Sequence, residues 1–407
     1  MATFSNMISV FLCLAFLVSS GSSAPSFTDI ESELTENINL FSLDLFKEYN
    51  KDDHAGKNTV MSAMSADMVL AMLSLGAEGK TLDEINAGLY LPDSEFTKKA
   101  YKPAIDMMND YQHVTLHLAF KAYVKDGKDY ALDPLYKAYV THLFGSEVEN
   151  IDFDKNHAAA DTINTWVEDK TNHTIKDIVQ PDYFDSYTAL VLVNTIYFKG
   201  DWEITFNPHY TAKVPFHTSA SKDIQVDMMF QQNYTKYVES SHLDAKMLEL
   251  NFEGSEMTMV FILPNEVDGL AALEDTLTKD YGKLKAMYDS LTKQYVTYVL
   301  PKFKIETAAD LTDDLTDLGM GTMFSNHAQL GGLTVNSKPI KVDKVVQKAY
   351  IDLNEQGVTA GAATAAITKH YDSSYPKTLF NADHPFCYGL VNSDGQIVFA
   401  GHFLGKQ

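Results

Sequence analysis

The sequence predicts an α+β fold in one large domain, and three features of the chain support this prediction. Helical patterns prevail as far as Thr171, and strand-like runs prevail from residue 189 onward. The chain lacks the regular alternation of strands and helices that builds a doubly wound parallel sheet. It also contains no internal repeat and no linker that would separate two domains.

Several helices can be placed from the spacing of apolar residues. Ile30, Leu34 and Ile38 begin an amphipathic pattern over residues 28–47. Residues 68–75 are apolar nearly all round, which is typical of a helix buried on most sides, and glycines at 76 and 79 should end it. The run Thr81-Leu82-Asp83-Glu84 has the pattern of a capping box and predicts a helix start before Ile85. Further helical patterns occupy residues 95–108, 161–171 and 311–318.

Strands follow from continuous or alternating apolar runs. Residues 189–198 are apolar without interruption, as in a strand that is covered on both faces. The last two strands, 386–391 and 397–403, flank Asp394-Gly395, a pair that favours a tight hairpin turn. A short strand and turn occupy residues 58–65, and other strand patterns occupy residues 247–252, 257–263, 302–306 and 345–353.

The N-terminus has the pattern of a secretory signal. Residues 7–18 are apolar and residues 19–24 are small, so the apolar centre is too short to span a bilayer and precedes a cleavage zone between Gly21 and Ala24. We therefore expect a signal peptide at residues 1–24 and a single domain at residues 25–407. The protein should be secreted, extracellular and not embedded in a membrane.

Composition excludes several classes of function. Cys13 leaves with the signal, so Cys387 alone cannot form an intramolecular disulfide or a cysteine-based metal site, and we expect it to be a buried, inert thiol. A net charge of −23 argues against nucleic acid as a partner. Asn172 and Asn233 each begin an Asn-X-Thr glycosylation sequence, which would make the protein a glycoprotein if both are exposed.

The sequence also lacks the motifs of common enzymes. The patterns G-x-S-x-G and H-E-x-x-H are absent, as is a phosphate loop that ends in G-K-S/T. The acidic pairs Asp52-Asp53 and Asp313-Asp314 are better explained as solvated charges or helix N-terminal residues than as metal ligands. We therefore expect no catalytic residue, no metal and no cofactor.

The most informative stretch is residues 347–386, and within it residues 358–366, which read VTAGAATAA. These nine residues are small or β-branched, without charge or proline. In an extended chain Val358, Ala360, Ala362 and Thr364 share one face, which is small and uncharged enough to enter a tight slot. A mobile linker is the simpler interpretation. The pattern favours a loop that can become a strand.

Taken together, these stretches resemble the serpins, serine protease inhibitors of the loop-insertion type. The resemblance covers essentially the whole mature chain and rests on the order and spacing of six stretches. They are 58–65 with the helix that follows, 194–202 with Phe206, 300–303, 317–320 with 323–325, 348–349 leading to 354–357, and 382–386. It implies three β-sheets, about eight or nine helices and an exposed reactive-centre loop at about residues 355–379.

The resemblance also implies a mechanism in which a target serine protease is the partner. In that family the protease attacks the loop and forms a covalent acyl-enzyme, and the cut loop then inserts into the central sheet and distorts the protease. The protein would act as a monomer. The residues that match the inserting hinge are Glu355, Gly357, Val358, Ala360, Ala362 and Thr364. Those that match the shutter, where the sheet opens, are Ser62, Ser65, Asn194 and Gln347, the last at a position that is often His in the family.

The position of the cut follows from the family's spacing. Counting fourteen positions from Gly357 gives Tyr371, with Asp372 after the cut, and a tyrosine there implies a chymotrypsin-like target. Lys369, followed by His370, is the alternative and would suit a trypsin-like protease. A non-inhibitory serpin that acts as a carrier, storage protein or chaperone is the competing class. Such relatives often carry charged or bulky hinge residues, and this hinge has none from Gly357 onward.

Overall fold

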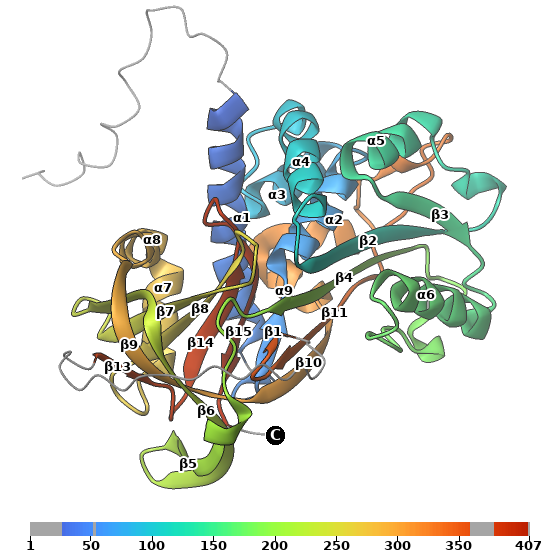
Figure 1. Ribbon diagram of the computed structural model, residues 1–407. Coiled ribbons are helices and arrows are strands. Elements are labelled where there is room, and N and C mark those ends of the chain that lie inside the picture. Colours follow the sequence, from blue (N-terminus) through green and yellow to red (C-terminus); the bar gives the residue numbers. More distant parts are fainter. Residues whose placement is uncertain (1–26, 52–53, 359–377, 406–407) are drawn as a thin grey trace, which may run out of the picture.

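The fold was examined in a computed structural model that describes residues 27–51, 54–358 and 378–405. Within these ranges the chain forms nine α-helices, most of them in its first half (Figure 1). Their bounds are α1 (Phe27–Tyr49), α2 (Ala63–Ser74), α3 (Gly79–Gly88), α4 (Ser94–Asn109), α5 (Pro134–Phe144), α6 (Asn156–Lys170), α7 (Leu270–Lys279), α8 (Tyr281–Asp289) and α9 (Thr312–Leu315).

The strands form two hydrogen-bonded sheets. The six-stranded sheet has the order β10 (Phe303–Asp310), β11 (Lys344–Leu353), β12 (Gly357–Val358), β4 (Leu190–Asp201), β2 (Thr115–Lys125) and β3 (Glu147–Ile151). The nine-stranded sheet has the order β1 (Thr59–Met61), β15 (Ile397–Phe403), β14 (Phe386–Val391), β8 (Thr258–Pro264), β7 (Ala245–Asn251), β6 (Lys222–Ser240), β9 (Thr292–Pro301) and β13 (Thr378–Asn381), with β5 (Ala212–Ser219) paired to β6.

The larger sheet accounts for two of the three expected sheets, because the long strand β6 belongs to both. Its 19 residues pair with β5 at one end, with β9 along the middle and with β7 at the other end. The family architecture expected from the sequence is therefore confirmed, with β6 as the strand that joins two of its sheets.

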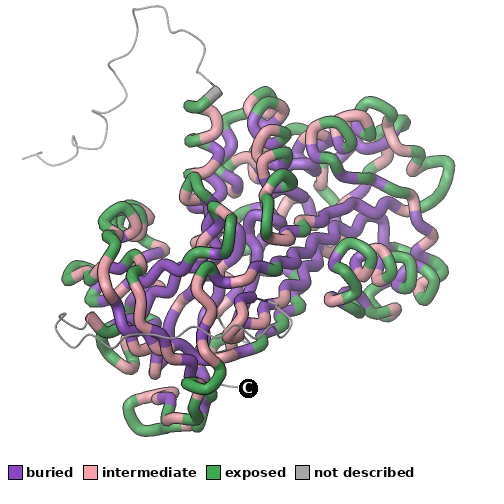
Figure 2. Tube along the Cα trace, viewed as in Figure 1, coloured by how far each residue is buried: buried purple, intermediate pink, exposed green. Residues whose placement is uncertain are grey.

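The core lies mainly between the two sheets and beneath α1 and α2 (Figure 2). Helix α2 is buried along its whole length and packs against β2, β4 and β15. A second apolar cluster lies on the other face of the six-stranded sheet, where α6 covers β2, β4 and β11. The central strands β4 and β11 are thus covered on both faces, as the uninterrupted apolar run of β4 predicts.

Several predicted elements are confirmed almost to the residue. The final hairpin consists of β14 and β15, and Gly395 in its turn has a φ of +76°, a conformation that favours glycine. The pair Asp313 and Asp314 lies in the first turn of α9, and Gly319 ends that helical segment with a φ of +90°.

The capping-box prediction is wrong. Helix α3 already begins at Gly79, so Thr81 lies inside it, and the Thr81 hydroxyl accepts a hydrogen bond from the backbone of Gln329. Glu84 instead accepts two hydrogen bonds from Thr322, each 2.8 Å long. The Thr81 and Glu84 side chains, which a local helix cap would have used, therefore accept hydrogen bonds from residues 322 and 329 instead. Our sequence analysis also did not place helices α5, α7 and α8 or strands β2, β3, β5, β6, β9 and β13.

No helix among the described residues has the length and apolar character needed to span a bilayer.

Candidate functional site

The candidate site lies where β11 and β4 part at one end of the six-stranded sheet. The two strands are parallel and pair directly from Lys344 opposite Val191 to Ala349 opposite Ile196. Beyond this point the short strand β12 enters between them and is antiparallel to both. The sheet therefore opens at this end to admit a strand.

Strand β12 is the first part of the predicted hinge. Val358 pairs with Leu353 of β11 on one side and with Gly200 of β4 on the other, and Gly357 pairs with Asp201. The chain thus turns back on itself after β11 and starts to fill the gap with the first residues of the loop.

Both residues of β12 fit this gap closely. The Val358 side chain is fully buried, in the same apolar cluster as Leu353 and Phe198, so it faces the core. A Cβ atom on Gly357 would lie 2.0 Å from the carbonyl oxygen of Gly200, so no larger residue fits without a shift of the backbone. The glycine is required here by close approach, and its φ is not positive.

The turn that leads into β12 is fastened to the end of β4 and the segment after it. The backbone N–H of Trp202 donates to the carbonyl of Gln356 at 2.8 Å, and its indole N–H donates to the carbonyl of Asn354 at 3.0 Å. The N–H of Phe206 donates to the carbonyl of Glu355 at 2.9 Å. Three backbone carbonyls of the turn are therefore satisfied by one neighbouring segment.

The side chain of Glu355 adds an ionic contact to this turn. Its carboxylate lies 2.7 Å from the ammonium of Lys302 and accepts a hydrogen bond of 2.7 Å from the Thr211 hydroxyl. Partial burial raises the pKa of Glu355, but the hydrogen bonds from Lys302 and Thr211 outweigh it and leave the pKa below its ordinary value. The hinge is thus held by a charged carboxylate at neutral pH.

The four predicted shutter residues meet in one buried hydrogen-bond network beneath β4 and β11. The Gln347 amide N–H donates to the Asn194 side-chain oxygen at 2.6 Å and to the Ser62 carbonyl at 2.8 Å. The Gln347 side-chain oxygen accepts from the Ser62 backbone N–H at 3.1 Å, and the Ser65 hydroxyl lies 2.9 Å from the Asn194 side-chain oxygen. All four residues are buried.

This network ties helix α2 to strands β4 and β11. Ser62 caps the N-terminus of α2, and its hydroxyl both accepts from the Ser65 N–H and donates to the carbonyl of Val398. Asn194 donates to the carbonyl of Val346 across the junction of β4 and β11. Because a glutamine and an asparagine do not titrate near neutral pH, these bonds hold over the physiological range.

The other predicted loop residues cannot be placed. Ala360, Ala362 and Thr364 of the hinge, and Lys369, His370, Tyr371 and Asp372 around the cut, lie outside the described residues.

The two glycosylation sequences differ in their setting. Asn172 is exposed, directly after α6, with a φ of +51°. Asn233 lies within β6, opposite the fully buried Val296, and the hydroxyl of Thr235 in the same sequence donates to the carbonyl of Glu249. Of the two acceptor asparagines, only Asn172 lies on an exposed turn.

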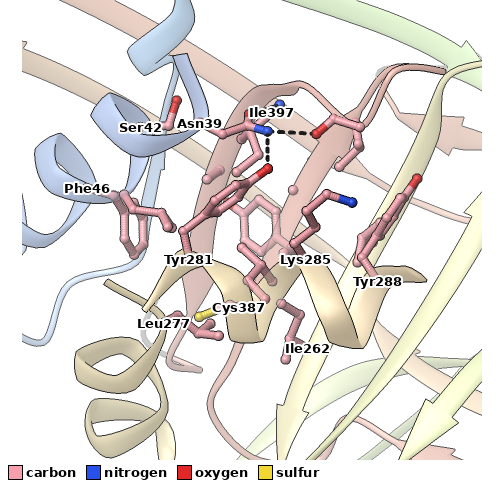
Figure 3. A pocket seen from close by; sticks show the side chains of 18 of the residues that line it. Asn39, Ser42, Phe46, Ile262, Leu277, Tyr281, Lys285, Tyr288, Cys387 and Ile397 are labelled. Atoms are coloured by element: carbon pink, nitrogen blue, oxygen red, sulfur yellow. Dashed lines mark hydrogen bonds between the residues drawn. The ribbon is translucent and has the colours of Figure 1, made fainter. Parts of the chain in front are cut away.

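A second hollow lies away from the loop, between α1, α8 and the sheet (Figure 3). It is a mainly apolar cavity of about 300 Å³, with Phe46, Leu277 and Ile262 in its wall. Asn39 at its edge donates hydrogen bonds of 2.9 Å to the Tyr281 hydroxyl and to the carbonyl of Gly395.

Cys387 also lines this cavity. It is half-buried, and burial together with the nearby Glu274 carboxylate raises the pKa of its thiol well above the ordinary value, as expected for an unreactive cysteine. In the parts of the chain that the structure describes, no group of three or more His, Cys, Asp or Glu side chains could hold a metal ion.

Some residues at the site were not assigned a role by sequence reasoning. Trp202, Phe206 and Lys302 entered only through their place in recognised stretches, without any link to the turn at Glu355. Thr211 was not singled out at all. These contacts join segments that are about 50 to 150 residues apart in the chain. The only sign of these contacts in the sequence was Trp202, because a buried tryptophan N–H needs a hydrogen-bond acceptor.

Comparisons with known proteins agree with this architecture. A family model described as "Serpin (serine protease inhibitor)" matches residues 36–405. The chain is 37% identical to "Antitrypsin" from Bombyx mori over 379 residues, which covers 93% of this chain and 95% of the relative. It is 36% identical to "Antichymotrypsin-2" from the same organism over 377 residues, which covers 92% and 99% respectively. The solved structure of Serpin48 from the insect Tenebrio molitor superposes with a TM-score of 0.84 at 33% identity and covers 93% of this chain and 99% of that one.

Proposed function

Because the chain belongs to the serpin family, we propose that it is a secreted inhibitor that traps serine proteases by inserting its cleaved loop into the six-stranded sheet. The observation that carries this proposal is the position of β12 between β11 and β4. The first hinge residues already occupy the gap between β11 and β4, and Val358 is buried there.

The register of β12 indicates where the rest of the hinge would go. If residues 359–366 continued the same antiparallel pairing, each inward residue would come between two facing residues of β4 and β11. Ala360 would lie between Phe198 and Ile351, Ala362 between Ile196 and Ala349, and Thr364 between Asn194 and Gln347. These inward positions face the main core, so small uncharged side chains suit them.

The shutter lies on this path. To admit Thr364, the strands must separate between Asn194 and Gln347, which now share a hydrogen bond of 2.6 Å. A threonine hydroxyl can hydrogen-bond to the groups that this separation exposes, so the network need not be left unsatisfied after insertion.

The chemistry of trapping belongs to the protease. Its serine oxygen attacks the carbonyl carbon of the residue before the cut, the peptide bond breaks, and the nitrogen of the next residue leaves as an amine. The resulting ester joins the two proteins. Insertion of the cut loop would carry the protease away before water hydrolyses the ester, and the inhibitor supplies no catalytic group.

The cut is expected between Tyr371 and Asp372. Incubation with chymotrypsin should give an adduct that survives SDS, together with a released C-terminal peptide whose mass corresponds to a start at Asp372. Substituting Tyr371→Ala should lower the rate of adduct formation with chymotrypsin by about 100-fold, because a deep apolar pocket loses its ligand.

Trypsin provides the matched comparison. A peptide that starts at His370 would move the cut to Lys369 and assign a trypsin-like target, in which case Lys369→Ala, and not Tyr371→Ala, should abolish trapping. The relatives named antitrypsin and antichymotrypsin support both classes of target. Clean cleavage by every protease tried, with no adduct, would contradict the inhibitory function.

Three further properties belong to this proposal. The signal at residues 1–24 would direct the protein out of the cell, and the domain of residues 25–407 would act as a monomer. Asn172 is the expected glycosylation site and Asn233 is not, because its sequence lies within a paired strand. Peptide mass spectrometry of the secreted protein distinguishes the two positions.

A carrier function is the second candidate, and the apolar cavity of Figure 3 favours it. A small apolar molecule could occupy that space without moving the loop. A carrier that does not insert its loop should melt at the same temperature before and after cleavage. For the inhibitor we expect cleavage in the loop to raise the melting temperature by about 20 °C or more, similar to the effect of several combined stabilising changes. Calorimetry on the intact and the cut protein measures this difference.

A further inference from the structure

At the end remote from β12, the junction between β4 and β11 is closed by the side chain of Asp343. One oxygen of its carboxylate accepts hydrogen bonds from the backbone N–H groups of Ala189, at 2.6 Å, and Leu190, at 3.2 Å. The Asp343 backbone N–H donates in the opposite direction, to the carbonyl of Leu190 at 2.8 Å. A single residue that precedes β11 therefore bonds both backbone groups of Leu190, the first residue of β4.

The Asp343 carboxylate also has an ionic partner. Its other oxygen lies 3.1 Å from the ammonium of Lys341, and its side chain is only 16% exposed. Hydrogen bonds from N–H groups to a carboxylate are stronger than those between neutral groups. The side chains of Asn194 and Thr195 also bond across the junction, but both are neutral. The charged contact therefore lies at the end of the sheet that an inserting loop would reach last.

The register of β12 brings one position of the loop to this contact. Val358 lies between its partners on β4 and β11. Ten residues further along, the same antiparallel pairing would set position 368 opposite Leu190 on one side and Asp343 on the other. Both candidate cuts lie beyond this position, so the cut loop contains it whichever bond is cleaved.

The Asp343 carboxylate takes the place of a backbone group of that loop position. Leu190 directs both its N–H and its carbonyl toward Asp343, and alternate residues of a strand direct these groups to the same neighbour. Gly200, which is ten residues on, accordingly pairs with Val358 of β12. The backbone at position 368 would therefore bond the N–H and the carbonyl of Leu190. The carboxylate and this backbone compete for the same N–H group.

We propose that Asp343 closes the far end of the gap in the intact protein and is displaced by position 368 in the last step of insertion. This inference rests on the proposed inhibitory function. After insertion the carboxylate keeps Lys341 as its partner, and it can accept from the hydroxyl of Thr368, which faces the same side in this register. Asp343 is thus a positioning residue whose bonds to β4 stabilise the intact form alone and oppose completion of the insertion.

The test compares Asp343→Ala with the wild type by calorimetry, each as intact protein and after cleavage in the loop. A fixed concentration of guanidinium chloride brings both forms into the measurable range. We expect Asp343→Ala to lower the melting temperature of the intact protein by about 4 °C, because two hydrogen bonds to a charged group are lost. The melting temperature of the cleaved protein should not change, whereas loss of a purely structural contact would lower both.

Two further variants serve as controls. Asp343→Asn keeps an oxygen that can accept from the two N–H groups, so it should lower the melting temperature of the intact form alone, and by less than alanine does. Asp310→Ala removes an aspartate that pairs with Lys344 across β10 and β11 at 2.5 Å. The gap opens on the other side of β11, so this variant should affect the intact and the cleaved protein equally.

The outcomes separate this inference from the proposed function. If the wild type melts at the same temperature before and after cleavage, the loop does not insert and the inhibitory function fails. If cleavage stabilises the wild type but Asp343→Ala lowers both melting temperatures equally, or neither of them, Asp343 is not displaced by the loop. The inference is then overturned and the inhibitory function stands.

Discussion

Replacing Ala362 with arginine is expected to convert the protein from an inhibitor into a substrate. In the continued register of β12, position 362 comes between Ile196 and Ala349 and faces the main core. An arginine there would bury an unpaired charge, at a cost of several kcal/mol, and would overpack the slot by about 1–3 kcal/mol more. Insertion should then be slower than hydrolysis of the acyl-enzyme, so the protease is released.

The measurement is the ratio of cleaved protein to SDS-stable adduct at increasing amounts of inhibitor. For Ala362→Arg we expect nearly all molecules to be cleaved without trapping. Two variants control for size and for charge. Ala362→Ser should trap normally, and so should Thr359→Arg, because position 359 would face outward beside Lys199, which is exposed, and Asp352, which is partly exposed. If Ala362→Arg still traps the protease as the wild type does, the inward face has been assigned wrongly.

The burial of Val358 and the final hairpin could be predicted because short-range sequence patterns encode both. Alternation of small residues places Val358 on the core face, and the structure buries it there. Asp394-Gly395 encodes its own turn, since the glycine adopts the positive φ that the hairpin needs. In each case neighbours in the sequence supply the physical reason for the conformation.

Contacts between remote segments could not be predicted in the same way. Glu84 has the spacing of a helix cap, yet Thr322, far along the chain, supplies better donors and the cap does not form. The turn at the hinge is fastened by Trp202 through bonds that no local pattern encodes. Sequence reasoning therefore placed Gly357 and Val358 but did not predict the contacts that attach the turn before them.

Helix α2 shows a further limit, because a buried carboxyl group interrupts the apolar pattern near its start. The predicted helix began at Met68, but the structure begins it at Ala63 and buries Asp67 completely. The hydroxyl of Tyr101 on α4 donates to one Asp67 oxygen at 2.7 Å, and the other oxygen, also buried, has no partner within the described residues. A carboxyl in this position is unexpected from the sequence, since an ionised group is costly in an apolar core.

Burial raises the pKa of Asp67 to about 7, against the smaller lowering effect of the Tyr101 hydrogen bond. The folded protein therefore favours the neutral acid, while the unfolded chain ionises near pH 4. The stability associated with this group is fully present below pH 4 and is lost as the pH rises through 7. A rise from 3.8 to about 7 corresponds to roughly 4 kcal/mol, which is a large share of the stability of a typical domain.

Substituting Asp67→Asn should therefore stabilise the protein at pH 8 and have little effect at pH 4. Asparagine keeps the shape and can still accept the Tyr101 hydrogen bond, but it does not ionise. Thermal or denaturant unfolding of both proteins between pH 4 and 8 measures the difference, which should grow with pH and level off above pH 7.

Tyr101→Phe is the informative partner, because loss of its hydrogen bond to Asp67 should move the midpoint of this pH dependence upward. Asp161→Asn, at an exposed position on α6, is the control and should leave stability unchanged at every pH. A difference between wild type and Asp67→Asn that is the same at pH 4 and pH 8 would mean that Asp67 is ionised in the folded protein throughout this range, and its burial would then need a counter-charge.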